Sequence, residues 1–194
     1  MNKMAKLNIV IADNESIIRM DLKEMLEEAG HTVVGESING IKAIELTRKL
    51  KPDLVIMDIK MPEMDGITAA KIIADEKLAP VILLTAFSQK NIVEKAKHAG
   101  VLAYLVKPIR QDSLFPAIEI AMSRFAEIQQ LEHDLNNVKN SLQMRKTLDR
   151  AKGILMDAYN ISESEAYRRI QKYSMAKRKS IKEVAEAIIR AATK

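Results

Sequence analysis

The sequence predicts an α/β protein with an open, doubly wound sheet of five parallel strands, followed by a long helix and an all-helical bundle. In the first 110 residues, five short apolar or β-branched runs alternate with stretches of helical periodicity. Four of these runs are almost continuously apolar, as expected for strands that are covered on both faces. No further strand pattern occurs after Pro108. Such an alternation is typical of an open, doubly wound sheet.

Each element of the sheet region can be placed from its pattern. The strands are expected at residues 7–12, 32–36, 53–57, 81–85 and 102–106. Apolar residues at helical spacing occupy 17–29 after the first strand and 92–99 before the last one. Gly30 and Gly100 follow these two stretches directly, and glycine is the residue expected where a helix stops.

The helical region begins with a single long pattern, which runs from Asp112, a plausible N-cap, to about Tyr159. Apolar residues within it alternate spacings of three and four, the pattern of a coiled-coil seam. This seam consists of Ile128, Leu131, Leu135, Val138 and Leu142. A parallel homodimer is favoured, because so long a helix cannot be covered by a domain of this size; the alternative is a helix packed on its own domain. Two short helices, 162–173 and 180–192, complete the bundle, and the first opens with the capping box Ser162 to Glu165.

Composition excludes several classes of protein. The 194 residues include no cysteine, which rules out disulfide scaffolds, thiolate metal sites and cysteine nucleophiles. The longest apolar runs are far shorter than the roughly 18 residues that a membrane-spanning helix needs. Asp13 interrupts the apolar N-terminal stretch before the core of a signal peptide could form. We therefore expect a cytoplasmic protein with no membrane partner.

The net charge of +5 is distributed unevenly along the chain. Residues 1–117 hold 16 basic and 16 acidic side chains, residues 118–138 hold one and four, and residues 139–194 hold 14 and six. The excess of eight positive charges in the last segment suggests a polyanionic partner. The alternative is a solvated basic face with no partner.

Polar residues close or follow the four most apolar strands. These residues are Asp13, Asp58, Thr85 and Lys107. In a parallel sheet they should converge on the edge where ligands bind. Two neighbouring carboxylates favour a cation such as Mg²⁺ between them, and a lysine and a hydroxyl would bind anionic oxygens. The set indicates a phosphoryl site with an aspartate as nucleophile. Each of these four residues alone could instead be a helix cap or part of a turn. The three histidines lie away from this edge of the sheet and are expected at the surface.

The motifs of the sheet region resemble the receiver domain of two-component response regulators. The residues that carry the resemblance are Asp13, Asp58-Ile59-Lys60-Met61-Pro62, Met64-Asp65-Gly66, Thr85-Ala86 and Lys107-Pro108. The resemblance implies that Asp58 accepts a phosphoryl group from a sensor histidine kinase, with Thr85 and Lys107 in the same site. It also implies that Asp13, Asn14, Asp58 and the carbonyl of Lys60 hold Mg²⁺, and that Thr85 and Tyr104 form the switch. Receivers usually have a second acid where this chain has Asn14, so we expect weaker Mg²⁺ binding and slower phosphorylation.

The basic end of the chain resembles the ANTAR domain, an RNA-binding module of transcription antitermination regulators. The residues that carry the resemblance are Arg145-Lys146, Ala151-Lys152-Gly153, Leu155-Met156, Ser162, Glu165-Ala166-Tyr167, Met175 and Val184-Ala185. The resemblance implies that dimers bind paired hairpins in a leader transcript. The expected RNA-binding residues are Arg145, Lys146, Arg150, Lys152, Gly153, Arg168, Arg169, Lys172, Lys177, Arg178 and Lys179. Tyr159, Tyr167 and Tyr173 could stack on unpaired bases or pack in the core.

These observations combine into one functional hypothesis. Residues 1–125 form a receiver domain, 112–144 a long coiled-coil helix and 145–194 an ANTAR domain. The protein is expected to be a regulator and not an enzyme: phosphorylation at Asp58 makes it dimerise and bind hairpin RNA, which promotes antitermination. The alternatives are a DNA-binding helical output or a basic bundle that docks an acidic protein. An enzymatic output is disfavoured, since the tail has no nucleophile with a base and no glycine-rich phosphate loop.

Overall fold

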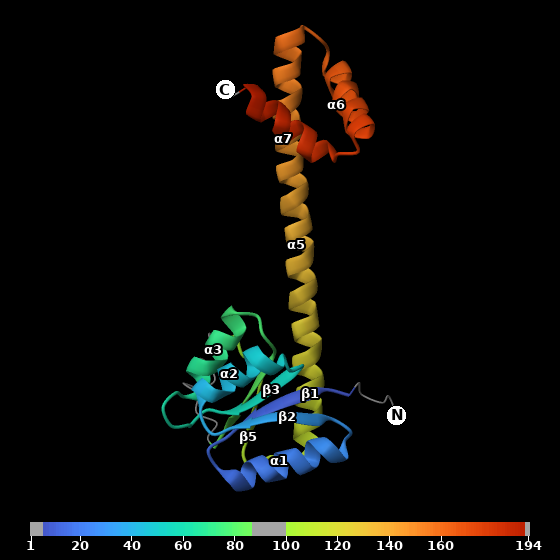
Figure 1. Ribbon diagram of the computed structural model, residues 1–194. Coiled ribbons are helices and arrows are strands. Elements are labelled where there is room, and N and C mark those ends of the chain that lie inside the picture. Colours follow the sequence, from blue (N-terminus) through green and yellow to red (C-terminus); the bar gives the residue numbers. More distant parts are fainter. Residues whose placement is uncertain (1–5, 87–99, 193–194) are drawn as a thin grey trace. The chain divides into compact units, whose positions relative to one another are not determined.

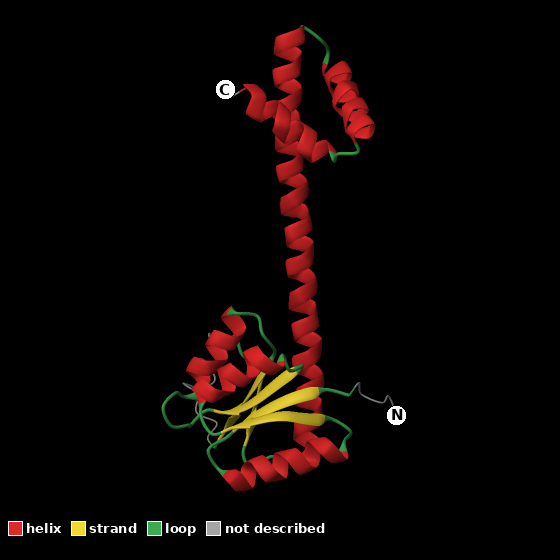
Figure 2. Cartoon of the chain, in the orientation of Figure 1, coloured by secondary structure: helices red, strands yellow, loops and turns green. Residues whose placement is uncertain are grey.

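The computed structural model describes residues 6–86 and 100–192. It divides into two compact units, with the division between Ile128 and Gln129. The first contains the sheet and its helices, and the second contains helices only, in the order that Figures 1 and 2 show along the chain. The helix expected at 92–99 lies outside the described residues.

The sheet has the five parallel strands that the sequence predicts, in the order β2-β1-β3-β4-β5. The strands are β1 Asn8–Ala12, β2 Thr32–Ser37, β3 Leu54–Asp58, β4 Val81–Thr85 and β5 Ala103–Val106. The predicted bounds agree with these to within one residue at each end. The doubly wound fold is thereby confirmed.

Alternate residues of each strand pack against helices on opposite faces of the sheet. Val10 and Ala12 of β1 join a core with α2 (Gly40–Leu50) and α3 (Gly66–Asp75). Ile9 and Ile11 join a second core with α1 (Ser16–Glu28) and the first turns of α5 (Gln111–Tyr159). Figure 1 shows α1 and α5 on one side of the sheet and α2 and α3 on the other. Coverage of both faces explains why the strands are so uniformly apolar.

Local signals set the ends of the helices. The side chain of Asn39 accepts a hydrogen bond from the Lys42 amide at the start of α2, and Asp65 accepts one from the Thr68 amide at the start of α3. Gly30 follows the end of α1 with φ of +90°, a conformation that glycine adopts without steric cost.

Three expectations for this unit are wrong in detail. Ile17 of the predicted buried stripe is exposed, whereas Leu22 and Leu26 are buried. His31 is buried rather than at the surface: its Nδ1 accepts a hydrogen bond from the Leu7 amide, and burial lowers its pKa. Asp112 lies inside the first turn of α5, because the helix begins one residue earlier.

The second unit is a small helical bundle formed by the end of α5, α6 (Glu163–Lys177) and α7 (Ile181–Ala192). Its core contains Ala151, Ile170, Val184 and Ala185, with partly buried residues such as Leu148 and Leu155 packed against it. Ala158, near the end of α5, is exposed. The all-helical prediction for this region is confirmed.

The reciprocal capping box of this unit opens α7 and not α6. The Ser180 amide donates to Glu183 Oε2 (2.7 Å) and the Glu183 amide donates to Ser180 Oγ (3.2 Å). Ser162 does cap α6 by accepting from the Glu165 amide, but the Glu165 carboxylate pairs with Arg168 and Arg169.

The predicted coiled-coil seam is exposed along the single chain. Its five residues are between 42% and 69% exposed, and they lie within the 49-residue helix α5. None of the described helices has a stretch long and apolar enough to cross a membrane.

Candidate functional site

The carboxyl edge of the sheet holds Asp13 and Asp58 at the point where the strand order reverses. Asp13 follows β1, and its amide donates to the Ser37 carbonyl at the end of β2. Asp58 ends β3, next to Leu84 of β4 in the register. Ligands of doubly wound proteins bind at such a switch point, so the topology places both acids where a ligand would sit.

Lys107, which follows β5, joins these two acids in a buried ionic cluster. Its Nζ lies 2.7 Å from Asp13 Oδ2, 2.9 Å from Asp58 Oδ1 and 3.5 Å from Glu15 Oε1. The Asp13 side chain is fully buried, and the side chains of Asp58 and Lys107 are 7% and 13% exposed. The structure therefore brings together three residues whose positions in the sequence are far apart.

The orientation of the Asp58 carboxylate is fixed from both sides. The Lys60 amide donates to Asp58 Oδ2 at 2.7 Å, while Oδ1 faces the Lys107 ammonium. Burial raises the pKa of Asp58, although Lys107 opposes this increase. Burial lowers the pKa of Lys107, but its hydrogen bonds with Asp13 and Asp58 outweigh this effect and the net pKa is raised. Lys107 is thus held in its charged form.

A cleft of about 170 Å³ opens at this cluster. It is lined by Asn14, Glu15, Asp58, Ile59, Lys60, Thr85, Ala86 and Lys107. Thr85, the last residue of β4, is buried (5% exposed) and lines the cleft together with Asp58. A small cleft lined by two acids, two lysines, an asparagine and a threonine suits an anionic group accompanied by a cation.

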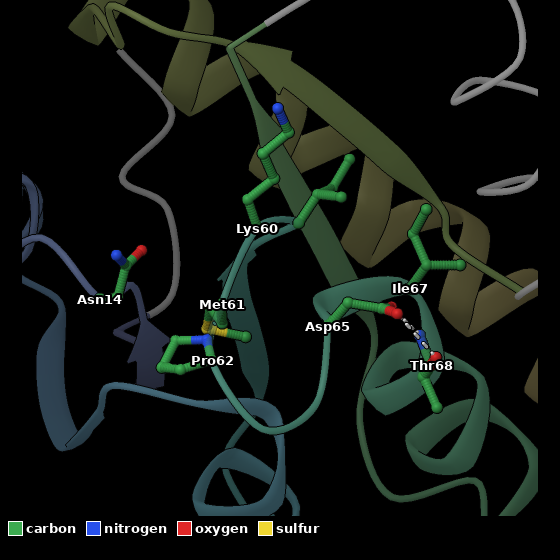
Figure 3. A pocket seen from close by; sticks show the side chains of 8 residues that line it. Asn14, Lys60, Met61, Pro62, Asp65, Ile67 and Thr68 are labelled. Atoms are coloured by element: carbon green, nitrogen blue, oxygen red, sulfur yellow. Dashed lines mark hydrogen bonds between the residues drawn. The ribbon is translucent and has the colours of Figure 1, made fainter.

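The oxygen atoms around the cleft could hold a metal ion only as a mixed set. Within residues 6–86 and 100–192, no three acidic or histidine side chains form a metal-binding group. A metal would need the Asp13 and Asp58 carboxylates together with the amide oxygen of Asn14 or the carbonyl of Lys60. Figure 3 shows Asn14 facing Met61 and Pro62 across the neighbouring pocket. The carboxylate, amide and carbonyl oxygens of this mixed set are hard donors, which Mg²⁺ prefers.

Gly66 is required by a close approach that sequence reasoning missed. A Cβ atom at this position would lie 2.0 Å from the Asp58 carbonyl oxygen. The Gly66 amide also donates to the Ile59 carbonyl at 2.9 Å. The start of α3 therefore packs directly on the backbone of Asp58. The signal available in the sequence was the position of Gly66 directly after Asp65 in the Met64-Asp65-Gly66 motif.

Tyr104 projects from the same face of the sheet as Thr85. In the β4–β5 register Thr85 lies opposite Val106, and Tyr104 is two residues before Val106. Tyr104 is 45% exposed, whereas Thr85 is buried. Tyr104 is therefore partly exposed, on the edge strand β5.

Nearly all of the basic residues predicted to bind RNA are exposed in the second unit. Arg145 and Arg168 have side chains that are 82% and 78% exposed. Lys146, Arg150, Arg169, Lys172, Lys177, Arg178 and Lys179 are exposed as well. The unit thus offers a distributed set of cations in which most charges face solvent.

Lys152 and Gly153 differ from the rest of that set. The Lys152 side chain is only 13% exposed and its Nζ pairs with Asp149 and Glu163, whose hydrogen bonds raise the pKa of Lys152. Gly153 lies within α5, and no atom would meet a Cβ at this position within 4 Å. Packing inside the described unit therefore does not require a glycine here.

Two family models match the chain: the response regulator receiver domain over residues 9–119 and the ANTAR domain over residues 136–189. The chain belongs to the response regulator family. It combines a receiver domain with an ANTAR domain, as the motifs predicted. It is 49% identical over 181 residues to the transcriptional regulatory protein PdtaR of Mycobacterium tuberculosis, which covers 93% of this chain and 88% of that protein.

Solved structures agree with the receiver assignment. The signal receiver domain of the putative response regulator NarL from Mycobacterium tuberculosis superposes with a TM-score of 0.58 at 28% identity, covering 61% of this chain and 97% of that one. A chain of the CheX–CheY–BeF3–Mg²⁺ complex from Borrelia burgdorferi gives a TM-score of 0.55 at 26% identity, covering 61% and 88%.

Proposed function

We propose that this response regulator is controlled by phosphorylation of Asp58 and binds hairpin RNA as a dimer to promote transcription antitermination. A sensor histidine kinase would donate the phosphoryl group. The observation that carries the proposal is the pairing, in one chain, of a buried Asp13–Asp58–Lys107 cluster with an ANTAR domain whose cations face solvent. The working domains are the receiver at 1–125, the long helix at 112–144 and the ANTAR domain at 145–194.

Asp58 is the nucleophile in this proposal. One carboxylate oxygen attacks the phosphorus of the donor phosphohistidine, the phosphorus–nitrogen bond breaks, and the phosphoryl group remains on Asp58. The Lys60 amide and the Lys107 ammonium hold the carboxylate in a fixed orientation. Lys107 neutralises charge on the transferring group, and the Thr85 hydroxyl donates to a phosphoryl oxygen.

Mg²⁺ fits the donors around this cleft. Asp13, Asp58, the Asn14 amide oxygen and the Lys60 carbonyl would hold it, and the ion would neutralise charge on the phosphoryl oxygens. Because Asn14 supplies a neutral oxygen in place of a carboxylate, the site has one negative charge fewer than two adjacent acids would provide. This lowers its affinity for a divalent cation.

The switch proceeds from Thr85 to Tyr104 and then to the dimer. Thr85 moves toward the phosphoryl group and vacates space, which the ring of the partly exposed Tyr104 then occupies. The changed surface of the fifth strand and α5 pairs with a second copy, and the exposed seam from Ile128 to Leu142 continues the pairing. Two ANTAR domains then bind two hairpins, so the affinity rises through effective concentration.

The RNA-binding surface consists of the exposed cations of the ANTAR domain. Contacts of Arg145, Arg168 and Arg169 with phosphates would supply a salt-dependent affinity. Lys146, Arg150, Lys152, Gly153, Lys172, Lys177, Arg178 and Lys179 complete the proposed surface. To bind RNA, Lys152 must exchange one of its two acidic partners for a phosphate.

Two measurements test the proposal. Intact mass spectrometry after incubation with acetyl phosphate and Mg²⁺ should show one added phosphoryl group on the wild-type chain and none on Asp58→Asn. The exposed Asp75→Asn, at the end of α3, serves as the matched control. Duplex DNA of the same length should not displace a bound two-hairpin RNA. Equal phosphorylation of Asp58→Asn, or displacement by the duplex, would contradict the proposal.

A further inference from the structure

The ANTAR domain contains a largely apolar cleft of about 370 Å³ between the end of α5, α6 and α7. Leu155, Ile170 and Ile188 line it, together with Tyr159, Tyr173 and Arg169. Its volume falls within the range of about 300–1,000 Å³ that is usual for small-molecule sites. The cleft belongs to this unit alone and lies apart from the phosphoryl site.

The two tyrosines of the cleft are exposed rather than packed in the core. Tyr159 is 62% exposed and Tyr173 is 53% exposed. The core of the unit is formed by Ala151, Ile170, Val184 and Ala185 and does not include them. Tyr167, also on α6, is 39% exposed but does not line the cleft. The aromatic rings at the cleft are therefore available to a ligand.

Arg169 is held at the same place by two contacts. Its guanidinium carbon lies 5.5 Å from the centroid of the Tyr159 ring, a cation–π distance. Its Nε lies 3.3 Å from Glu165 Oε1. The side chain is 48% exposed, so it is accessible to a ligand. An arginine fixed over one face of an aromatic ring presents both a flat stacking surface and a positive charge.

We propose that this cleft captures one unpaired base of the RNA loop, stacked on the rings of Tyr159 and Tyr173, with Arg169 contacting the adjoining phosphate. The inference rests on the RNA-binding function proposed above and names the site at which the loop is read. Aromatic faces and arginine planes are the surfaces on which splayed bases stack.

Charge selects a nucleotide over an apolar peptide as the occupant. Residues 139–194 carry 14 basic and six acidic side chains, so a polyanion is attracted to the whole unit. Arg168 and Lys172 lie on α6 with Arg169, are exposed and add positive charge to that helix. An apolar helix would gain nothing from these cations, whereas the phosphates on either side of a captured base would contact them.

The test uses the full-length protein and a stem–loop RNA selected by that protein from a pool with randomised loops. The fluorescent base 2-aminopurine is placed at each loop position in turn. With the wild-type chain, stacking should quench its fluorescence at one position. Tyr173→Ala and Tyr159→Ala should abolish that quenching and weaken binding about 5- to 150-fold, the range expected for one base–aromatic stack.

Three further variants separate stacking from a structural effect. Tyr173→Phe keeps the ring and should retain quenching and affinity. Tyr173→Leu keeps an apolar side chain without a ring and should lose both. Gln171→Ala, on α6 but outside the cleft, should change affinity less than twofold, and melting curves should show that every variant is folded.

The possible results distinguish failure of the RNA-binding function from failure of the base-capture inference. If the wild-type chain selects no RNA from the pool, the RNA-binding function fails and the cleft has no loop to capture. If it selects RNA but Tyr159→Ala and Tyr173→Ala bind and quench as the wild type does, the base-capture inference alone is overturned. Full activity of Tyr173→Leu would also overturn it, because the cleft would then require only an apolar side chain.

Discussion

The two domains carry their charges in opposite ways. In the receiver, Asp13 and Asp58 are buried, and the largely enclosed Lys107 Nζ lies within 3 Å of both carboxylates. In the ANTAR domain, Arg145 and Arg168 are largely exposed and have only long contacts with acids. Buried charges depend on geometry and respond strongly to a single change, whereas exposed charges act additively and are screened by salt. Single substitutions should therefore be severe in the receiver and graded in the ANTAR domain.

The largest contrast is expected between two glycines. Gly66→Ala places a Cβ 2.0 Å from the Asp58 carbonyl, which should lower the free energy of unfolding by about 1–3 kcal/mol and prevent phosphorylation. In Gly153→Ala the added Cβ meets no atom within 4 Å. This substitution should raise the free energy of unfolding by about 0.5–1 kcal/mol, because alanine favours a helix. Urea denaturation measures both. A destabilised Gly153→Ala, or a stable and phosphorylatable Gly66→Ala, would contradict this comparison.

The next largest effect concerns the pH dependence of phosphorylation. Only the ionised Asp58 carboxylate can attack, and burial raises its pKa, so the rate should fall on acidification at a higher pH than for an ordinary aspartate. Removing the ammonium in Lys107→Met takes away a charge that lowers this pKa and should move the midpoint to still higher pH. Initial rates with acetyl phosphate across a pH series measure the shift; a midpoint that moves to lower pH in the variant would refute this electrostatic role.

A smaller effect is expected at the metal site. Asn14→Asp adds a carboxylate beside Asp13 and should tighten Mg²⁺ binding about tenfold, equivalent to ~1.4 kcal/mol of added attraction. Calorimetric titration of the wild-type and variant chains with Mg²⁺ gives the two dissociation constants. Asn137→Asp on α5 adds the same charge far along the chain from the site and controls for net charge. Equal affinity in all three chains would show that residue 14 does not face the ion.

The smallest effects are expected from single cations of the ANTAR domain. Arg168→Ala should weaken RNA binding a few-fold and reduce the slope of log K against log salt by about 1, as expected for one lost phosphate contact. Lys152→Ala differs, because it leaves Asp149 and Glu163 without their shared partner and should also lower the melting temperature. Filter binding over a salt series measures the first effect. An unchanged salt slope in Arg168→Ala would place this arginine outside the RNA interface.

Features that depend on the local sequence pattern could be predicted, whereas features that depend on tertiary packing could not. Strands covered on both faces are continuous apolar runs, so their bounds could be predicted to within one residue. The polar residues at their ends could be grouped as well, because parallel strands bring them to one edge. Contacts set by tertiary packing could not be predicted: the approach of Gly66 to Asp58, the burial of His31 and the enclosure of Lys152 by two acids. The second capping box, Ser180 to Glu183, had a visible sequence pattern that was overlooked.

The coupling between the two domains is tested most directly by RNA affinity measured with and without an analogue of phospho-Asp58. Binding of a two-hairpin leader RNA to the wild-type chain would be titrated in the presence of Mg²⁺, with and without beryllofluoride. Affinity should increase with beryllofluoride, together with dimerisation on a sizing column, and Asp58→Asn should show neither response. Equal affinity in both conditions, or binding by a monomer as tight as by the dimer, would contradict control of the ANTAR domain by the receiver.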